Sequence, residues 1–359
     1  MALTAALLVG AACTSTPPLA KDQPGPRLPS CTSGVSLLGF SDALDKTMFR
    51  ASTVGGLSAL TYDAVRDVYY ALVDNQGASA ARFYTLSLPL TSEGLGTPRV
   101  LEVTELRDSA GQPFTGTDFD GEGIALLRQG ELAIASETEP SLRRFSLDGR
   151  FLGDVPVPGR FKVTPAGDAL GNAAFEGLTV SPTGLVLTAA MEGPLKTDGQ
   201  TPDGRFRIRL LRYESHEPDA LQLAAQHFYL SEPGQGVAEL AAVSDDELLV
   251  LERGFVAGLG NTVRLFSVSL SGAADVSSQE SLQSATSDQA LAKRLLLDLS
   301  DCPSSGAQNR APQKNPLLDN FEGVALGPAS PAGQALLLVS DDNFNPTQIT
   351  RVVALQLGR

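Results

Sequence analysis

Short apolar runs recur along the chain, and the first run of each group carries a similar phrase. Three copies read Glu-Gly followed by apolar residues, and two looser copies keep the apolar part. The five copies lie at residues 55–59, 122–126, 176–180, 239–243 and 322–326. Recurrence of one phrase is the signature of a repeat architecture. We therefore expect five copies of one structural unit.

Each phrase is followed by three further apolar runs, separated by Gly, Pro, Asp and Asn. The second run of every unit ends in an acid, at Asp74, Glu137, Glu192, Glu252 and Asp341. The third run of every unit begins with an arginine, at Arg82, Arg144, Arg212, Arg264 and Arg351. Four short strands with turn residues between them are typical of a propeller blade. The pattern predicts an all-β protein, a β-propeller of five four-stranded blades.

The fifth unit has only three strands before the sequence ends. Residues 35–42 match the pattern of the fourth strand of unit four, at residues 295–301. We expect this N-terminal strand to complete the fifth blade, because closing the ring removes unpaired sheet edges. Six blades are the alternative, if residues 272–318 contain another unit. The propeller domain is expected to span residues 34–359.

The N-terminal segment has the composition of a targeting signal. Residues 1–12 are apolar and small, which predicts a signal peptide, and the polar, Pro-rich residues 13–33 are expected to form a flexible tether. The segment resembles a bacterial lipoprotein signal, in which Cys13 is acylated. An ordinary secretory peptide is the alternative. Either interpretation predicts an exported protein, held in the cell envelope or released to the periplasm or exterior.

Charge and cysteine content bear on partners and compartment. The formal net charge is −14, which argues against nucleic acid or an anionic membrane as a surface-wide partner. Membrane contact is expected only through a lipid anchor on Cys13, and the protein is expected to be a monomer.

In an oxidising compartment Cys31 and Cys302 can pair, which would tie the closing strand to unit four. Two free thiols are the alternative.

Propeller geometry predicts where the recurring polar residues meet. The start of strand one and the end of strand two lie on the same face of the ring, near the mouth of the central channel. We expect Glu122, Glu176, Glu239 and Glu322 to converge there, and a hard cation would neutralise them. The acids that end the second strands are expected instead to pair with the arginines across each hairpin and to hold the blades together.

Two acidic turns strengthen the cation hypothesis. The first places Asp118, Asp120 and Glu122 two residues apart, and the second joins Asp341 and Asp342 to two asparagines. Donor sets made only of oxygen suit Ca²⁺, although such turns are also common as solvated loops. The sequence contains no Gly-x-Ser-x-Gly elbow, phosphate-binding Gly-rich loop or His-Glu-x-x-His motif.

Several of these segments together resemble an exported family described as having the esterase-like activity of phytase. The segments are residues 120–124, 172–180, 251–255, 320–325 and 340–343, and the resemblance covers residues 34–357. It implies a β-propeller and the hydrolysis of ester or phosphoester bonds, with assistance from a metal ion.

The two lines of reasoning combine into one mechanistic hypothesis. Glu122, Glu176 and Glu322, with Asp341 or Asp342, would hold Ca²⁺ at the channel mouth. An arginine would steady the anionic oxygens of a small anionic or ester substrate, and the candidates are Arg144, Arg253 and Arg351. The alternative is a non-enzymatic propeller lipoprotein that serves in binding or scaffolding at the cell surface.

Overall fold

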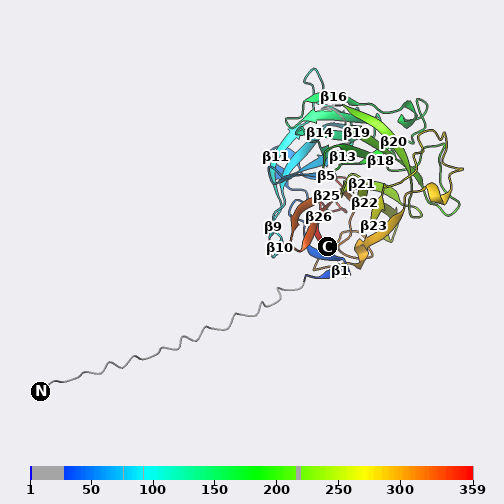
Figure 1. Ribbon diagram of the computed structural model, residues 1–359. Helices are drawn as coiled ribbons and strands as arrows, with labels where there is room; N and C mark the ends of the chain where they lie inside the picture. Colours follow the sequence, from blue (N-terminus) through cyan, green and yellow to red (C-terminus); the bar gives the residue numbers. More distant parts are fainter. Residues whose placement is uncertain (2–27, 76, 92, 216–219, 359) are drawn as a thin grey trace.

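The described chain forms a ring of five antiparallel sheets (Figure 1). Apart from Met1, the computed structural model describes residues 28–75, 77–91, 93–215 and 220–358. The predicted signal peptide and Cys13 lie outside the described residues. No helix within the described ranges is long and apolar enough to cross a membrane.

Each sheet is one blade of four main strands. The first three blades are formed by β5 (Leu57–Asp63), β6 (Val68–Val73), β8 (Arg82–Ser87) and β11 (Arg99–Glu105); by β13 (Gly121–Leu126), β14 (Glu131–Ser136), β15 (Ser141–Ser146) and β16 (Phe151–Val155); and by β17 (Phe175–Val180), β18 (Val186–Met191), β19 (Arg207–Ser215) and β20 (Leu221–Leu230). The last two are formed by β21 (Gly236–Ala242), β22 (Glu247–Val256), β23 (Gly260–Ser269) and β24 (Lys293–Asp298), and by β25 (Phe321–Ser330), β26 (Gly333–Ser340), β27 (Val352–Leu357) and β2 (Val35–Ser41).

The remaining elements are short. They are β1 (Ser30–Thr32), the pair β3 (Met48–Phe49) and β4 (Ser52–Thr53), the pair β7 (Gly77–Ala80) and β12 (Thr115–Gly116), the pair β9 (Leu90–Thr91) and β10 (Gly94–Leu95), and three 3₁₀ turns, η1 (Gly159–Phe161), η2 (Ser287–Gln289) and η3 (Leu299–Asp301). Residues 272–318 contain only β24, η2, η3 and loops. The five-bladed prediction is confirmed, and no sixth blade is present in the described chain.

The innermost strands of the blades contact one another around the ring, in the order β5, β13, β17, β21, β25 and back to β5. The glycine of the recurring Glu-Gly phrase permits this close approach. A Cβ atom on Gly123 would lie 2.3 Å from the carbonyl oxygen of Glu176, and one on Gly323 would lie 3.0 Å from the backbone of Ala59. The phrase therefore marks the places where neighbouring inner strands meet.

The N-terminal strand closes the ring as predicted. Strand β2 pairs antiparallel with β27, from Val35 opposite Leu357 to Ser41 opposite Val352. Strand β1 then pairs with β2, and a disulfide joins Cys31 to Cys302, next to η3. Residues 30–32 therefore belong to the propeller and not to the predicted tether. Two contacts fix this short segment: β1 pairs with the edge of β2 that faces away from β27, and the disulfide links Cys31 to Cys302.

Apolar side chains pack between adjacent blades and form the core. The largest buried cluster joins the second, third and fourth blades and includes Leu178, Leu211, Leu240 and Val250. These side chains alternate along their strands with residues that face the other side of each sheet. Burial between blades leaves the ends of the inner strands free to carry polar residues.

Candidate functional site

The recurring glutamates sit at irregularities in the inner strands. Each inner strand contains a register shift near its first residues, which is a β-bulge. The residues at the equivalent bulged position of the five blades are Ser58, Glu122, Glu176, Ala238 and Glu322. A bulge re-aims the side chain that it carries, and in three blades that side chain is a carboxylate.

A second set of equivalent residues follows the second strands. Four backbone N–H groups in this set donate to carbonyl groups near the start of the inner strand, for example Asp74 to Gly56 at 2.7 Å and Glu192 to Ala174 at 2.7 Å. In the fourth blade the equivalent residue is Arg253, which is paired with Gly236 at the start of the inner strand. The five equivalent residues are Asp74, Glu137, Glu192, Arg253 and Asp341.

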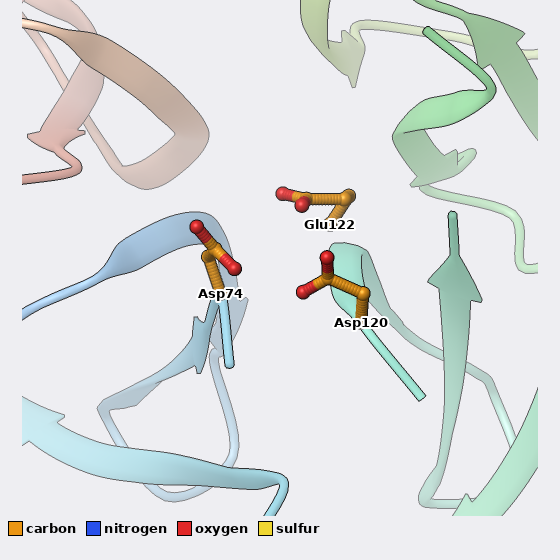
Figure 2. Close-up of side chains that lie close together, drawn as sticks. All are labelled: Asp74, Asp120 and Glu122. Carbon is orange, nitrogen blue, oxygen red and sulfur yellow. The ribbon is translucent and has the colours of Figure 1, made fainter. Parts of the chain in front are cut away.

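The three glutamates of the first set and all five residues of the second set line one cavity of about 480 Å³. Its lining includes eight carboxylates: Asp74, Asp120, Glu122, Glu137, Glu176, Glu192, Glu322 and Asp341. Figure 2 shows three of them, from two neighbouring blades, directed toward a common space. Among the described residues that line the cavity, Arg253 is the only cationic side chain.

Burial and mutual repulsion make these carboxyl groups hard to ionise. Burial raises the pKa of Asp120 to about 8 and that of Glu137 to about 7, and nearby carboxylates contribute to both shifts. Burial also raises the pKa of Glu122, Glu176 and Asp341 well above the usual range, again with neighbouring carboxylates adding to the effect. Burial and mutual repulsion therefore favour protons or a cation among these acids.

Arg253 neutralises one side of the cavity. Its Nη2 atom lies 3.0 Å from Oε1 of Glu322 and 3.4 Å from Oε1 of Glu192. Burial raises the pKa of both glutamates, and Arg253 offsets part of that rise. Glu322 also accepts a hydrogen bond from Nδ2 of Asn320 at 3.0 Å.

The other side of the cavity has the features of a cation site. Glu122 and Glu176 are more than nine-tenths buried, yet neither makes a hydrogen bond or ion pair with another described residue. Carboxylate oxygens of Asp74, Asp120 and Glu122 lie within 4.8 Å of one another, and so do those of Glu122, Glu137 and Glu176. A donor set made only of oxygens fits Ca²⁺.

Three of the predicted metal ligands lie elsewhere. Glu239 takes the place that Gly123 has in its blade, fully buried, and its Oε1 accepts the N–H groups of Leu178 at 2.7 Å and Leu240 at 3.0 Å. The alignment that equated Glu239 with Glu122 is wrong by one residue. Asp118 is exposed and caps a turn by accepting the N–H of Thr115 at 2.7 Å.

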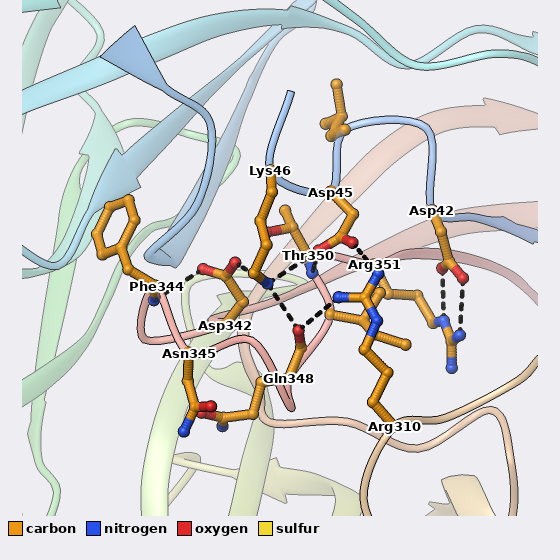
Figure 3. Close-up of polar contacts among 12 residues, drawn as sticks. Asp42, Asp45, Lys46, Arg310, Asp342, Phe344, Asn345, Gln348, Thr350 and Arg351 are labelled. Atoms are coloured by element: carbon orange, nitrogen blue, oxygen red, sulfur yellow. Dashed lines mark hydrogen bonds and ion pairs between the residues drawn. The ribbon is translucent and has the colours of Figure 1, made fainter. Parts of the chain in front are cut away.

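Asp342 also lies outside the cavity lining, although its neighbour Asp341 is part of it. One carboxylate oxygen of Asp342 accepts the N–H groups of Gly56 and Phe344, and the other lies 2.7 Å from Nζ of Lys46 (Figure 3). Both oxygens are thus already occupied by donors within the protein.

Two of the predicted arginines have structural positions. Arg144 lies inside β15, with Nη1 3.3 Å from Oε2 of Glu131. Arg351 is fully buried and binds Asp42 through Nε at 2.7 Å and Nη2 at 2.8 Å. Neither lines the cavity, so of the three candidates only Arg253 does.

The hairpin ion pairs expected between second and third strands are also wrong for three blades. In the third blade, Arg212 pairs with Glu214 and Asp246, each at 3.0 Å, and not with Glu192. Arg351 pairs with Asp42 and not with Asp341, and Arg264 pairs with Asp298 at 3.0 Å and not with Glu252. The acids that end the second strands instead line the cavity in four blades. The recurrence of an acid at the end of every second strand was the sequence signal for these cavity residues, although the pattern favoured a blade-stabilising ion pair with arginine.

Known structures and sequences provide a comparison. No curated protein sequence matches the chain. Solved structures that match include hydrazine synthase of Kuenenia stuttgartiensis, at 10% identity and a TM-score of 0.39, covering 87% of this chain and 67% of that one. A PQQ-bound aldose sugar dehydrogenase of Streptomyces coelicolor matches at 16% identity and a TM-score of 0.36, covering 84% and 80%. Virginiamycin B lyase of Staphylococcus aureus matches at 10% identity and a TM-score of 0.34, and the chain spans 65% of its length.

A family model gives a broader match. The model is described as phytase-like, with the esterase-like activity of phytase, and it matches residues 52–344, well over half of the chain. The matched region contains all five inner strands and every carboxylate that lines the cavity. The chain therefore belongs to the phytase-like family.

Proposed function

We propose that this protein is an exported hydrolase of phosphoester or ester substrates that acts at the channel mouth with a bound divalent cation, Ca²⁺ foremost. The observation that carries the proposal is the pair Glu122 and Glu176, two buried carboxylates that share a cavity with six others and have no partner among the described residues. Buried carboxylates so close together favour cation binding. The description of the family supports hydrolysis.

The donor groups suggest which residues hold the cation. Glu122 belongs to both groups of close carboxylates, with Asp74 and Asp120 on one side and with Glu137 and Glu176 on the other. We therefore place Glu122 at the centre of the site. Bound Ca²⁺ supplies Lewis-acid polarisation of an ester or phosphoryl oxygen and favours ionisation of water.

Arg253 is the residue suited to steady an anionic substrate oxygen. Its Nη2 atom is engaged by Glu322, but its Nε atom is buried and has no hydrogen-bond acceptor among the described residues. The Arg253 side chain lines the cavity and is 19% exposed, so a substrate oxygen can approach its guanidinium group, and such groups bind anionic oxygens strongly. Of the three candidate arginines we assign this role to Arg253, because Arg144 and Arg351 do not line the cavity.

Export forms part of the proposal. The disulfide between Cys31 and Cys302 supports it, because such bonds persist in oxidising compartments. A lipid anchor on Cys13 would keep the monomer at the membrane with its ring in the aqueous phase.

The proposal is tested with the purified full chain, an aryl phosphate and an aryl ester, each assayed with added Ca²⁺ and with chelator. We expect hydrolysis only with Ca²⁺. The Glu122→Gln variant should need about 10- to 100-fold more Ca²⁺ for half-maximal activity, because it removes a charged ligand. The matched control is Asp118→Asn, which alters an exposed acid outside the cavity. Failure to hydrolyse either substrate with Ca²⁺ would contradict the proposal and favour the non-enzymatic alternative.

A further inference from the structure

The cavity has a second chemical character besides its acids. Seven carboxamide side chains also line it. One of them, Asn320, already donates to Glu322. We call the other six the carboxamide set: Asn172, Asn261, Gln313, Asn343, Asn345 and Gln348. They come from the loop before β17, from β23, from the loop before β25 and from the loop between β26 and β27. Segments far apart in the sequence thus bring the same functional group to one cavity.

Most of this hydrogen-bonding capacity is unused by the protein. The amides of Asn172, Asn261, Asn343 and Gln348 make no hydrogen bond with any other described residue. Asn345 uses only its Oδ1 atom, which accepts two bonds from Thr347 at 2.9 Å. Each free amide offers two donor hydrogens and an acceptor oxygen to a ligand.

One aromatic ring completes the lining. Strands β22 and β23 continue past the point where other blades end their second strands, and Phe255 in this extension lies opposite Asn261. Phe255 lines the cavity and is 64% exposed. Its neighbour Asn261 is anchored through its N–H, which donates to Oε1 of Gln313 at 2.8 Å. An apolar surface therefore stands directly beside free amides.

Charge limits what this lining can accept. Eight carboxyl groups face one arginine, so wherever these acids are ionised an anionic ligand without a cation is repelled. Neutral hydroxyl groups meet no such penalty, because they donate to carboxylate oxygens and accept from amide N–H groups. The volume of about 480 Å³ lies within the roughly 300–1,000 Å³ of small-molecule sites.

We infer that the cavity binds a neutral polyhydroxylated ligand of the size of a small sugar, through the carboxamide set and the ring of Phe255. The hydroxyl groups bind the amides and carboxylates, and the C–H face of the sugar ring packs on Phe255. The inference rests on the proposed function for the identity of the site. It adds that the group recognised beside the scissile ester is sugar-like and uncharged.

The experiment is calorimetric titration of the full chain with a panel of neutral mono- and disaccharides, with Ca²⁺ and with chelator. We expect a member of the panel to bind, and glucose 1-phosphate to bind at least tenfold more weakly than methyl glucoside in chelator. Phe255→Ala and Asn343→Ala should each weaken binding about tenfold, which is about 1.4 kcal/mol. The matched control is Leu259→Ala, on the same hairpin, 69% exposed and outside the cavity lining, which should bind as the parent does.

Absence of binding across the panel would overturn the inference, and so would equal losses in Leu259→Ala and Phe255→Ala. Stronger binding of the sugar phosphate in chelator would also overturn it. Because binding is measured without turnover, the two proposals fail separately. Saccharide binding without hydrolysis of aryl substrates leaves this inference standing, whereas hydrolysis without saccharide binding leaves only the proposed function.

Discussion

The ammonium group of Lys46 lies 2.7 Å from Oδ2 of Asp342, and this contact separates two adjacent aspartates into different environments. Asp341 lines the cavity, whereas Asp342 is fully buried behind it and is bound by Lys46. Lys46 lies in the turn that follows the ring-closing strand β2. The N-terminal segment thus both closes the propeller and holds the loop that borders the cavity (Figure 3).

Removing Lys46 should destabilise the protein. The change Lys46→Met leaves the buried carboxylate of Asp342 without its cation, and Lys46 itself is only partly exposed. We expect a loss of about 2 kcal/mol in the free energy of unfolding, measured in urea. The control is Lys314→Met, because the only hydrogen bond that Nζ of Lys314 makes with a described residue is to the half-buried Ser300 hydroxyl, at 2.9 Å. Equal losses of unfolding free energy in the two variants would show that the contact with Asp342 adds no more stability than the Lys314 contact does.

Two glutamates of the cavity should respond in opposite ways to neutralisation. Glu122→Gln removes a buried charge that has no described partner, so without Ca²⁺ the protein should keep or gain stability. Glu322→Gln removes the ion-pair partner of Arg253 and should lower stability by about 1 to 3 kcal/mol. Melting curves with Ca²⁺ and with chelator measure both effects. If Glu122→Gln were destabilised equally in both conditions, the cation site would be ruled out.

The raised pKa values predict how stability depends on pH when metal is removed. In the folded protein Asp120 titrates at about pH 8 and Glu137 at about pH 7, whereas both titrate near pH 4 in the unfolded chain. Between these limits the folded state binds more protons, so stability falls as pH rises from about 5 to about 8. The melting temperature in chelator should therefore be higher at pH 5.5 than at pH 8.5. Added Ca²⁺ should raise it most at pH 8.5, and an unchanged profile would contradict the coupling of these acids to a cation.

Opening the disulfide should weaken ring closure. Cys31 and Cys302 are 271 residues apart, so the bond restricts a very large loop in the unfolded chain. Cys31→Ser should lower the free energy of unfolding by about 2 to 5 kcal/mol. The reduced parent protein should melt at the same temperature as the variant.

A deletion of residues 34–42 removes the fourth strand of the fifth blade and should lower stability more than Cys31→Ser does. If the deletion variant were as stable as the parent protein, closure of the ring by the N-terminal strand would be ruled out.

The repeat and the blades could be predicted from the sequence, because they depend on local chemistry. Alternating apolar residues, turn residues and the Glu-Gly phrase recur in each unit, and each acts over a few neighbouring positions. The matching pattern of residues 35–42 was enough to predict ring closure. The convergence of Glu122, Glu176 and Glu322 on one cavity also followed, since equivalent positions of the blades lie around one ring.

The exact residues of the cavity were decided by tertiary structure. In the fourth blade Ala238 and Arg253 take the positions equivalent to Glu176 and Glu192, where the linear pattern suggested Glu239 and Glu252. A shift of one residue turns a side chain to the opposite face of a strand, and apolar alternation does not reveal where a bulge lies. The partner of Arg351 likewise depended on the closing segment, because Asp42 lies more than 300 residues away in the sequence. Local patterns therefore determined the propeller, and contacts between distant segments determined which of its acids share the cavity.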